Sequence, residues 1–242
     1  ILGTDKYAAA LMDLFTSAYQ QENLSKATRY LVNAIFGKYG LVIIDGDDVQ
    51  LKQQFSAVMQ DELLHQHAVK LVNEQIAKLE AAGYKQQAFP RQINLFYLEQ
   101  NSRTRIEYDL ETEKYIVLNT SISFSKEEIL QELKKHPERF SPNVILRPLY
   151  QQKVLPAIAY IGGGGELSYW LQLKPIFEYY KVNFPQLILR NSALLVNMST
   201  LKKIDKIGWT AADFFQDLEL LKKLFIAQKT DENIDVSECK IE

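Results

Sequence analysis

The chain has 242 residues, of which 47% are hydrophobic and 24% are charged, and its formal net charge is −2. This composition predicts an ordinary globular protein with a sizeable core. The near-neutral charge excludes a general electrostatic attraction to nucleic acid or to an anionic membrane, so we expect neither as a partner.

Two further properties restrict the class of protein. No apolar run approaches the roughly 18 residues that a membrane-spanning helix needs. The single cysteine, Cys239, excludes an internal disulfide and a cluster of thiolate metal ligands, which favours a cytoplasmic location. Because residue 1 is isoleucine and no signal region precedes the first predicted helix, we expect the chain to be a piece of a longer protein.

Residues 1–83 predict the first part of an α/β core. The run Leu41–Ile44 is short and apolar throughout, as in a strand of a parallel sheet that is buried on both faces. The cluster Asp45–Asp48 follows it and could bind a metal ion, but a turn that caps the next helix is the favoured interpretation. Apolar residues recur at helical spacing in three segments, 5–21, 23–38 and 49–82.

Two histidines, His65 and His67, lie within the predicted helix at 49–82. Residues two apart on a helix point about 200° away from each other. We therefore expect two surface histidines that cannot share a metal ion, since helical metal ligands are usually four residues apart. No metal site is predicted.

Residues 84–141 predict a small β-rich insertion. Three runs rich in β-branched and aromatic residues are separated by short polar turns, which indicates an antiparallel meander. Ser125, followed by Glu128 three residues later, predicts a capping box at the start of a short helix. The three predicted strands cover 93–99, 103–109 and 114–120.

Residues 142–211 predict the second part of the core. The order of strand, helix and strand across 157–189 indicates a βαβ unit with parallel strands and a right-handed crossover. Arg147 precedes Pro148, which favours an extended backbone at Arg147. Further short strands are predicted at 144–146 and 194–196, and a helix at 200–207.

Residues 212–242 continue a helix that is predicted to begin near Thr210 and then form a polar tail. The helix has heptad-like apolar spacing at Phe214, Leu218, Leu221 and Phe225. The tail from Lys229 is polar and is predicted to be disordered.

Four consecutive glycines, Gly162–Gly165, separate the predicted strand at 157–161 from a helix that is predicted to begin at Glu166. Glycine lets a ligand approach backbone N–H groups closely, and a helix N-terminus adds partial positive charge. A carboxylate or a phosphate is the natural occupant, with Arg190 expected at the same edge of the sheet. The alternative is a glycine-rich turn without a ligand.

The glycines do not match the common nucleotide fingerprints. G-x-G-x-x-G fails because Leu167 or Ser168 stands where the third glycine belongs, and Arg190 replaces the acidic residue expected after the next strand. A P-loop sequence is also missing from the chain, so an NAD site and a P-loop are both disfavoured.

The segment RPLYQQKVLPAIAYIGGGGELSYWLQLKPIFE, residues 147–178, resembles the characteristic region of the bacillithiol biosynthesis cysteine-adding enzyme family, BshC. The family pattern is close to RPLYQ, LP, AY-[IV]-GG-x-GE and YW-x-QLK in that order. Gly164 departs from it, because many members have proline there. The resemblance spans nearly the whole chain and places it in the middle of the family sequence. Other segments that agree are FGKYGLVIIDGDD, LEAAGYKQQ, NLFYLE and GWTAADFFQDLE.

The resemblance implies a fold and a reaction. The fold would be α/β, with a Rossmann-like parallel sheet covered by helices on both faces, a small antiparallel β insertion and a C-terminal helix leading into a coiled coil. The full-length protein would be a homodimer that adds cysteine to the amine of glucosaminyl malate in the last step of bacillithiol synthesis. ATP is the expected energy source, because amide ligation needs an activated carboxylate.

Roles for individual residues follow as hypotheses. Glu166 would bind or deprotonate the attacking amine, with Arg147 and Tyr169 as the other catalytic residues. Arg147 and Arg190 would hold a carboxylate or phosphate, although a structural ion pair is the alternative for each charged residue. The residues predicted to bind substrate or nucleotide are Gly162, Gly163, Gly165, Tyr150, Gln172, Lys174, Arg190 and Asn191.

Two other functions remain open at this stage. The first is a non-catalytic module on the same fold that binds a nucleotide or another ligand, or that dimerises. The second is a different adenylating or sugar-nucleotide enzyme. Binding of nucleotide and of the amino-thiol precursor would distinguish a ligase from a scaffold.

Overall fold

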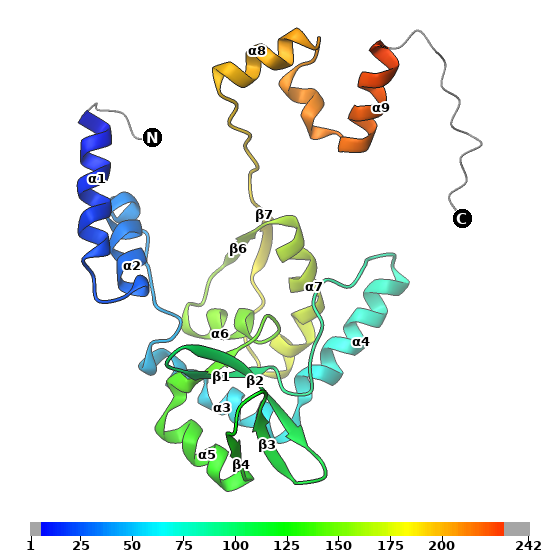
Figure 1. The fold of residues 1–242 in the computed structure, drawn as a ribbon. Helices are drawn as coiled ribbons and strands as arrows, with labels where there is room; N and C mark the ends of the chain where they lie inside the picture. The colour runs from blue at the N-terminus through cyan, green and yellow to red at the C-terminus, as the bar shows by residue number, and fades with distance from the viewer. Residues whose placement is uncertain (1–5, 230–242) are drawn as a thin grey trace. The chain divides into compact units, whose positions relative to one another are not determined.

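The computed structural model describes residues 6–229, which form two units, the first ending at Arg190 and the second beginning at Asn191. The first unit mixes helices with a five-stranded antiparallel sheet and a separate pair of parallel strands (Figure 1). Its helices are α1 (Lys6–Tyr19), α2 (Leu24–Phe36), η1 (Gly37–Tyr39), α3 (Val49–His65), α4 (His67–Ala81), α5 (Lys126–Lys135), η2 (Pro137–Arg139), α6 (Arg147–Val154) and α7 (Gly164–Tyr179). Its strands are β1 (Leu95–Glu99), β2 (Ser102–Asp109), β3 (Lys114–Val117), β4 (Ser123–Phe124), β5 (Phe140–Pro142), β6 (Ala159–Gly162) and β7 (Gln186–Leu189).

The antiparallel sheet has the strand order β4-β3-β2-β1-β5. Its register pairs Phe96 with Arg105 and Tyr108 with Tyr115, so the predicted meander is confirmed. Alternate side chains on β1 and β3 are buried, as expected for a sheet with one face on the core. The Tyr115 hydroxyl donates to the Leu63 carbonyl over 3.0 Å, which attaches β3 to the end of α3.

The parallel pair consists of β6 and β7 joined by α7, so the predicted βαβ unit is present. Tyr160 pairs with Leu187, and Gly162 pairs with Leu189. The larger parallel sheet of the prediction is not found among residues 6–229, where the five-stranded sheet is antiparallel and the three further core strands that we predicted are not strands.

The prediction of a buried strand at Leu41–Ile44 is wrong. The segment has no regular structure and its side chains are mostly exposed, with Val42 71% exposed. Residues 194–196 are also irregular, and Leu195 is 96% exposed. An apolar run forms a strand only when another strand pairs with its backbone, and the described residues provide none here.

The predicted strand at 144–146 is a turn that leads into α6. The Asn143 side chain accepts a hydrogen bond from the Ile145 N–H over 2.8 Å, which bends the chain. Arg147 is therefore helical and not extended as predicted. Pro148 is tolerated because its missing N–H falls in the first helical turn, where no intrahelical bond would form.

The predicted long helix at 49–82 is two helices. Gln66 has a left-handed backbone, with φ 54° and ψ 36°, and separates α3 from α4. The His65 and His67 rings consequently stack, with their centroids 5.5 Å apart. The prediction that they point away from each other is wrong, because it assumed an unbroken helix.

Side-chain hydrogen bonds define the starts of two helices as predicted. Asp48 accepts bonds from the N–H groups of Gln50 and Leu51, so the acidic cluster caps α3. Ser125 and Glu128 form the predicted capping box of α5. Both caps satisfy N–H groups that have no partner within the helix.

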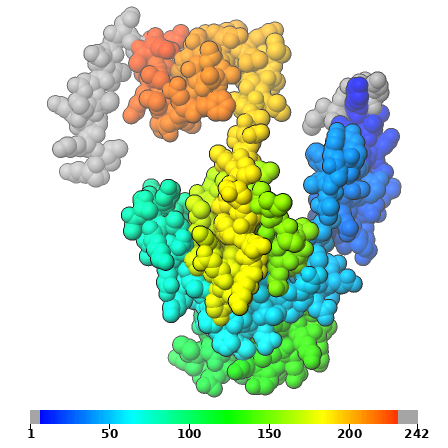
Figure 2. Space-filling model, turned by 180° about the vertical axis from the view of Figure 1, so that it is seen from behind, coloured from blue at the N-terminus to red at the C-terminus, as the bar shows by residue number. Residues whose placement is uncertain are grey.

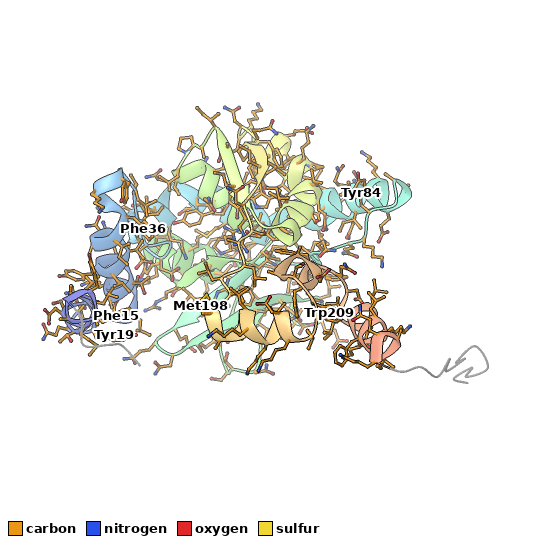
Figure 3. The ribbon with its side chains drawn as sticks, turned by 90° about the horizontal axis from the view of Figure 1, so that it is seen from above. Phe15, Tyr19, Phe36, Tyr84, Met198 and Trp209 are labelled. Carbon is orange, nitrogen blue, oxygen red and sulfur yellow. The ribbon has the colours of Figure 1, made fainter. Side chains whose placement is uncertain are left out.

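The core of the first unit lies between α3, α4, α6, α7 and the sheet. Helix α7 contributes a fully buried row that includes Trp170, Leu173 and Phe177. Helix α4 packs along α7, and the cyan surface of α4 lies beside the yellow-green surface of α7 and β7 in Figure 2. Helices α1 and α2 pack on each other, and Phe15, Tyr19 and Phe36 remain exposed on them (Figure 3).

The second unit contains α8 (Met198–Lys206), η3 (Ala211–Phe215) and α9 (Leu218–Lys229). Trp209, labelled in Figure 3, makes edge contacts with Phe214 and Phe225, at centroid distances of 5.8 and 5.9 Å. The helix predicted from Thr210 to Gln228 is interrupted at Gln216, which has an extended backbone. No coiled coil is found within the described range, and the predicted disordered tail lies outside it apart from Lys229, which ends α9. None of the helices at 6–229 has the length and apolar character needed to cross a membrane.

Glu62, in the last turn of α3, should make the stability of the fold depend on pH. Its side chain is fully buried and accepts two hydrogen bonds from Asn94, of 2.9 Å from the backbone and 2.7 Å from the side chain. Burial raises the pKa of Glu62 in spite of these bonds, so the folded protein holds this proton more tightly than the unfolded chain does. The contribution of Glu62 to stability is therefore present at low pH and is lost as pH rises from about 4.3 through the raised pKa.

We predict that the unfolding free energy of the wild type falls relative to that of Glu62→Gln across this pH window. Urea unfolding at a series of pH values measures it. Glu74→Gln removes the same charge from an exposed position on α4 and should not change the profile. Parallel profiles for the wild type and Glu62→Gln would contradict the assignment.

Candidate active site at the glycine turn

The glycine turn joins β6 directly to α7. Gly162 is the last residue of β6, Gly163 is the N-cap with φ −70° and ψ 165°, and Gly164 begins the helix. The helix starts two residues earlier than predicted, so only Gly163 of the four glycines lies outside regular structure. Glu166 thereby becomes the third helical residue, from which a side chain can reach back to the N-cap.

The Glu166 carboxylate closes the N-terminus of α7. One oxygen accepts a hydrogen bond from the Gly163 N–H over 2.9 Å, and the other accepts from the Tyr160 hydroxyl over 3.1 Å. The hydrogen bond from the Gly163 N–H lowers the pKa of Glu166. Burial opposes this effect, and Tyr160, Arg147 and Arg190 add to the lowering. A carboxylate that stays ionised is a weak base, so of the two predicted roles the geometry favours binding a cationic amine over deprotonating it.

Arg147 reaches the same place from the first turn of α6. Its guanidinium is half-buried and donates to the Gln151 side chain and to the Tyr169 hydroxyl, each over 2.8 Å. Arg147 and Tyr169 therefore lie together, as two members of one site should. The Arg147 charge also contributes to lowering the pKa of Glu166.

Arg190 approaches the turn from the end of β7. Its N–H donates to the Gly162 carbonyl over 2.9 Å, which extends the pairing of β6 with β7 by one residue. Its guanidinium lies beside Gly163, where an added Cβ would be 3.5 Å from Arg190 Cζ. The Arg190 guanidinium thus lies beside Gly163, and the charges of Arg147 and Arg190 both act on the Glu166 carboxylate. This arrangement suits a ligand carrying both an anionic and a cationic group.

The glycines of the turn differ in what the fold requires of them. A Cβ on Gly162 would lie 2.8 Å from the Tyr160 ring and 3.1 Å from Leu167, so packing demands glycine there. A Cβ on Gly164 or Gly165 would meet nothing within 4 Å among the described residues. Packing against Tyr160 and Leu167 therefore explains why residue 162 is glycine. The space in front of the first turn of α7 stays open.

Two predicted residues on α7 do not reach the turn. Gln172 is buried, accepts from the N–H groups of Gln87 and Ala88 over 2.9 and 3.1 Å, and donates to the Ala88 carbonyl over 2.9 Å. Lys174 is exposed and lies 3.9 Å from Glu178. It is eight residues beyond Glu166, or about 12 Å along the helix. Gln172 holds a neighbouring segment on α7, and Lys174 belongs to the outer surface.

Two further predicted residues lie elsewhere. Tyr150 is buried and donates to the Gly46 carbonyl over 2.9 Å. Burial, followed by the charge of Asp47 and its acidic neighbours, raises the pKa of Tyr150 to about 12. Tyr150 thus holds the acidic turn before α3. Asn191 is exposed and begins the second unit.

Sequence reasoning missed Tyr160 and Gln151. Tyr160 bonds Glu166, and its ring stacks on Trp170 at a centroid distance of 4.1 Å. Gln151 orients Arg147. Both belong to the quoted family pattern, as the tyrosine of AY and the glutamine of RPLYQ, and that pattern could have identified them.

Comparison with known proteins decides the family. The profile described as "Bacillithiol biosynthesis BshC, N-terminal Rossmann-like domain" matches residues 1–191. The chain belongs to the BshC family. The predicted family is confirmed, and the Rossmann-like description agrees with the mixture of helices and strands in the first unit.

BshC relatives cover almost all of this chain. A Flavobacterium psychrophilum protein named "Putative cysteine ligase BshC" is 50% identical over 99% of this chain and 44% of its own length. Proteins with the same name from Flavobacterium johnsoniae and Christiangramia forsetii are 48% and 45% identical, over 91% and 98% of this chain. The chain spans 41–44% of the length of these relatives.

The two glycines on either side of Gly163 should respond differently to the same substitution. We predict that Gly162→Ala lowers the unfolding free energy by about 1–3 kcal/mol, because the methyl group overlaps the Tyr160 ring. Gly164→Ala should be neutral or stabilising by up to about 1 kcal/mol, because it enters open space in a helix. Urea unfolding compares the two variants, and equal effects would contradict the packing argument.

Proposed function

We propose that the glycine turn is part of the active site of a ligase that joins the carboxyl group of cysteine to the amine of glucosaminyl malate, the last step of bacillithiol synthesis. Membership of the BshC family and the names of the relatives support this reaction class. The observation that carries the placement is the Glu166 carboxylate, which accepts from the Gly163 N–H and is acted on by the charges of Arg147 and Arg190.

The charges of the site suit the two partners of an amide ligation. Cysteine brings a carboxylate, which Arg147 and Arg190 can hold by charge-assisted hydrogen bonds. The first-turn N–H groups of α7 point toward the same space and favour an anion there. The Glu166 carboxylate can hold the ammonium form of an amine and orient it toward the carboxyl carbon.

Tyr169 and Tyr160 are positioning residues in this proposal. Tyr169 accepts a hydrogen bond from Arg147, and Tyr160 donates one to Glu166, so each restrains the direction of a charged group. The ammonium first loses a proton to solvent. Its nitrogen then attacks the activated carboxyl carbon and forms the new C–N bond with loss of a second proton, while one carboxyl oxygen leaves with the activating group. ATP would supply the activation that converts this oxygen into a leaving group.

We predict that Glu166→Gln in the full-length protein lowers product formation by about 10–100-fold, because a hydrogen bond between the carboxylate and the charged amine, worth about 1.5–3 kcal/mol, is lost. The amide oxygen can still accept from the Gly163 N–H, so stability should change little. The assay is the formation of bacillithiol from glucosaminyl malate, cysteine and ATP, followed by mass spectrometry.

Glu178→Gln is the matched control, because Glu178 is exposed on the same helix and lies 3.9 Å from Lys174. An unchanged rate for Glu166→Gln would contradict the role of Glu166. If the wild-type full-length protein formed no product but bound ATP or glucosaminyl malate in calorimetry, a non-catalytic binding module would replace the ligase.

A second variant pair tests whether a ligand enters the space before α7. Gly165→Ala should raise the KM for one substrate by about tenfold, because its methyl group enters the space that the fold leaves open. Gly164→Ala adds the same methyl group one residue earlier, where the family commonly carries proline, and should have a smaller effect. Equal KM values for both variants and the wild type would contradict a ligand at this turn.

A further inference from the structure

A second cluster of potential ligands lies at the far end of α7 from the glycine turn, where α3 meets α4 (Figure 1). Asp61, His65 and His67 each offer one ligand atom, and these atoms all lie within 4.8 Å of one another. Helix α7 has 16 residues and is therefore about 24 Å long, which separates this cluster from Gly163.

The break in the helix creates the cluster. Asp61 and His65 are four residues apart on α3 and so share one face. In an unbroken helix His67 would point about 200° away from His65. The left-handed Gln66 turns the chain, α4 restarts at His67, and the two imidazole rings stack with centroids 5.5 Å apart.

Residues at the end of α7 support the cluster. The Tyr180 hydroxyl donates to Asp61 Oδ2 over 2.8 Å, while Asp61 Oδ1 lies 2.8 Å from His65 Nδ1. The Tyr179 ring packs against the His67 ring, with centroids 4.8 Å apart. A hydrogen-bonded tyrosine that fixes the direction of a carboxylate is the kind of supporting contact that metal ligands have in proteins.

We propose that Asp61, His65 and His67 bind one divalent transition-metal ion, with Zn²⁺ as the best match. Two imidazoles and one carboxylate suit Zn²⁺, and also Co²⁺, Ni²⁺ and Cu²⁺, whereas Mg²⁺ and Ca²⁺ prefer oxygen ligands only. Ligand atoms about 2.1 Å from a tetrahedral Zn²⁺ are about 3.4 Å from one another. Rotation of the exposed and half-buried side chains of this cluster can close the remaining distance.

The metal would hold together three helices. It would bridge α3 and α4 across their break, and the Tyr180 bond to Asp61 would connect the bridge to the end of α7. With three protein ligands, a fourth position remains for water or another small ligand. The site is separate from the proposed ligase chemistry, so loss of metal binding and loss of the ligase reaction are distinguishable results.

The test is a titration of the 242-residue chain, prepared without a histidine tag and with Cys239→Ser, using Zn²⁺ alone and Co²⁺ alone. We expect about one equivalent of either ion to bind, a rise in the thermal midpoint, and Co²⁺ absorption bands of a four- or five-coordinate site with nitrogen and oxygen ligands. His67→Gln should lose the bands and weaken Zn²⁺ binding by more than 100-fold, since it removes a ligand. Tyr180→Phe should weaken it by about 10–100-fold, because it removes only the supporting hydrogen bond.

His136→Gln is the matched control. His136 lies near Glu138, with 3.1 Å between its Nδ1 and the carboxylate, and the variant should bind Zn²⁺ as the wild type does. Circular dichroism of the metal-free variants checks that they fold, and His65→Asn, at an exposed position, replaces His67→Gln if that variant does not. Unchanged Zn²⁺ affinity in the His67 or His65 variant, or an equal loss in His136→Gln, would overturn the proposal.

Discussion

The candidate site depends on one contact, the hydrogen bond from the Gly163 N–H to the Glu166 carboxylate. This bond sets the first residue of α7 and keeps Glu166 ionised at the point where β6 ends. A negative charge at a helix N-terminus is itself favourable. The charges of Arg147 and Arg190 then act on an ionised carboxylate, so the site combines both signs of charge.

Helix α7 connects this contact to the rest of the first unit through its packing and hydrogen bonds. Its first turn carries Glu166, its buried middle packs on α4, and Gln172 holds the backbone of Gln87 and Ala88. Tyr180, just after its last turn, bonds Asp61 on α3. From sequence alone, a buried polar residue that holds the backbone cannot be told from one that binds a ligand. Gln172 was therefore predicted to bind substrate.

Local patterns were reliable where one segment supplies both partners of an interaction. The capping box of Ser125 and Glu128 and the β-meander contain their own hydrogen-bond partners within a few residues. The predicted strand Leu41–Ile44 failed because a strand needs a neighbour, and apolar composition does not say whether one is present. The prediction of one long helix was wrong at Gln66, whose residue type gives no sign of a break. The predicted directions of the two histidine side chains were wrong for the same reason.

By itself, the sequence determined the family, through the resemblance of residues 147–178 to the family pattern. It also determined the βαβ unit and the strand-to-helix turn at the glycines, because these follow from residue types at short spacing. Only the tertiary structure decided which side chains meet at the turn and which do not. Arg147, Tyr160 and Arg190 come from α6, β6 and the end of β7, and only packing brings them to Glu166. The approach of His67 to Asp61 likewise depends on the left-handed backbone of Gln66, which no side-chain pattern records.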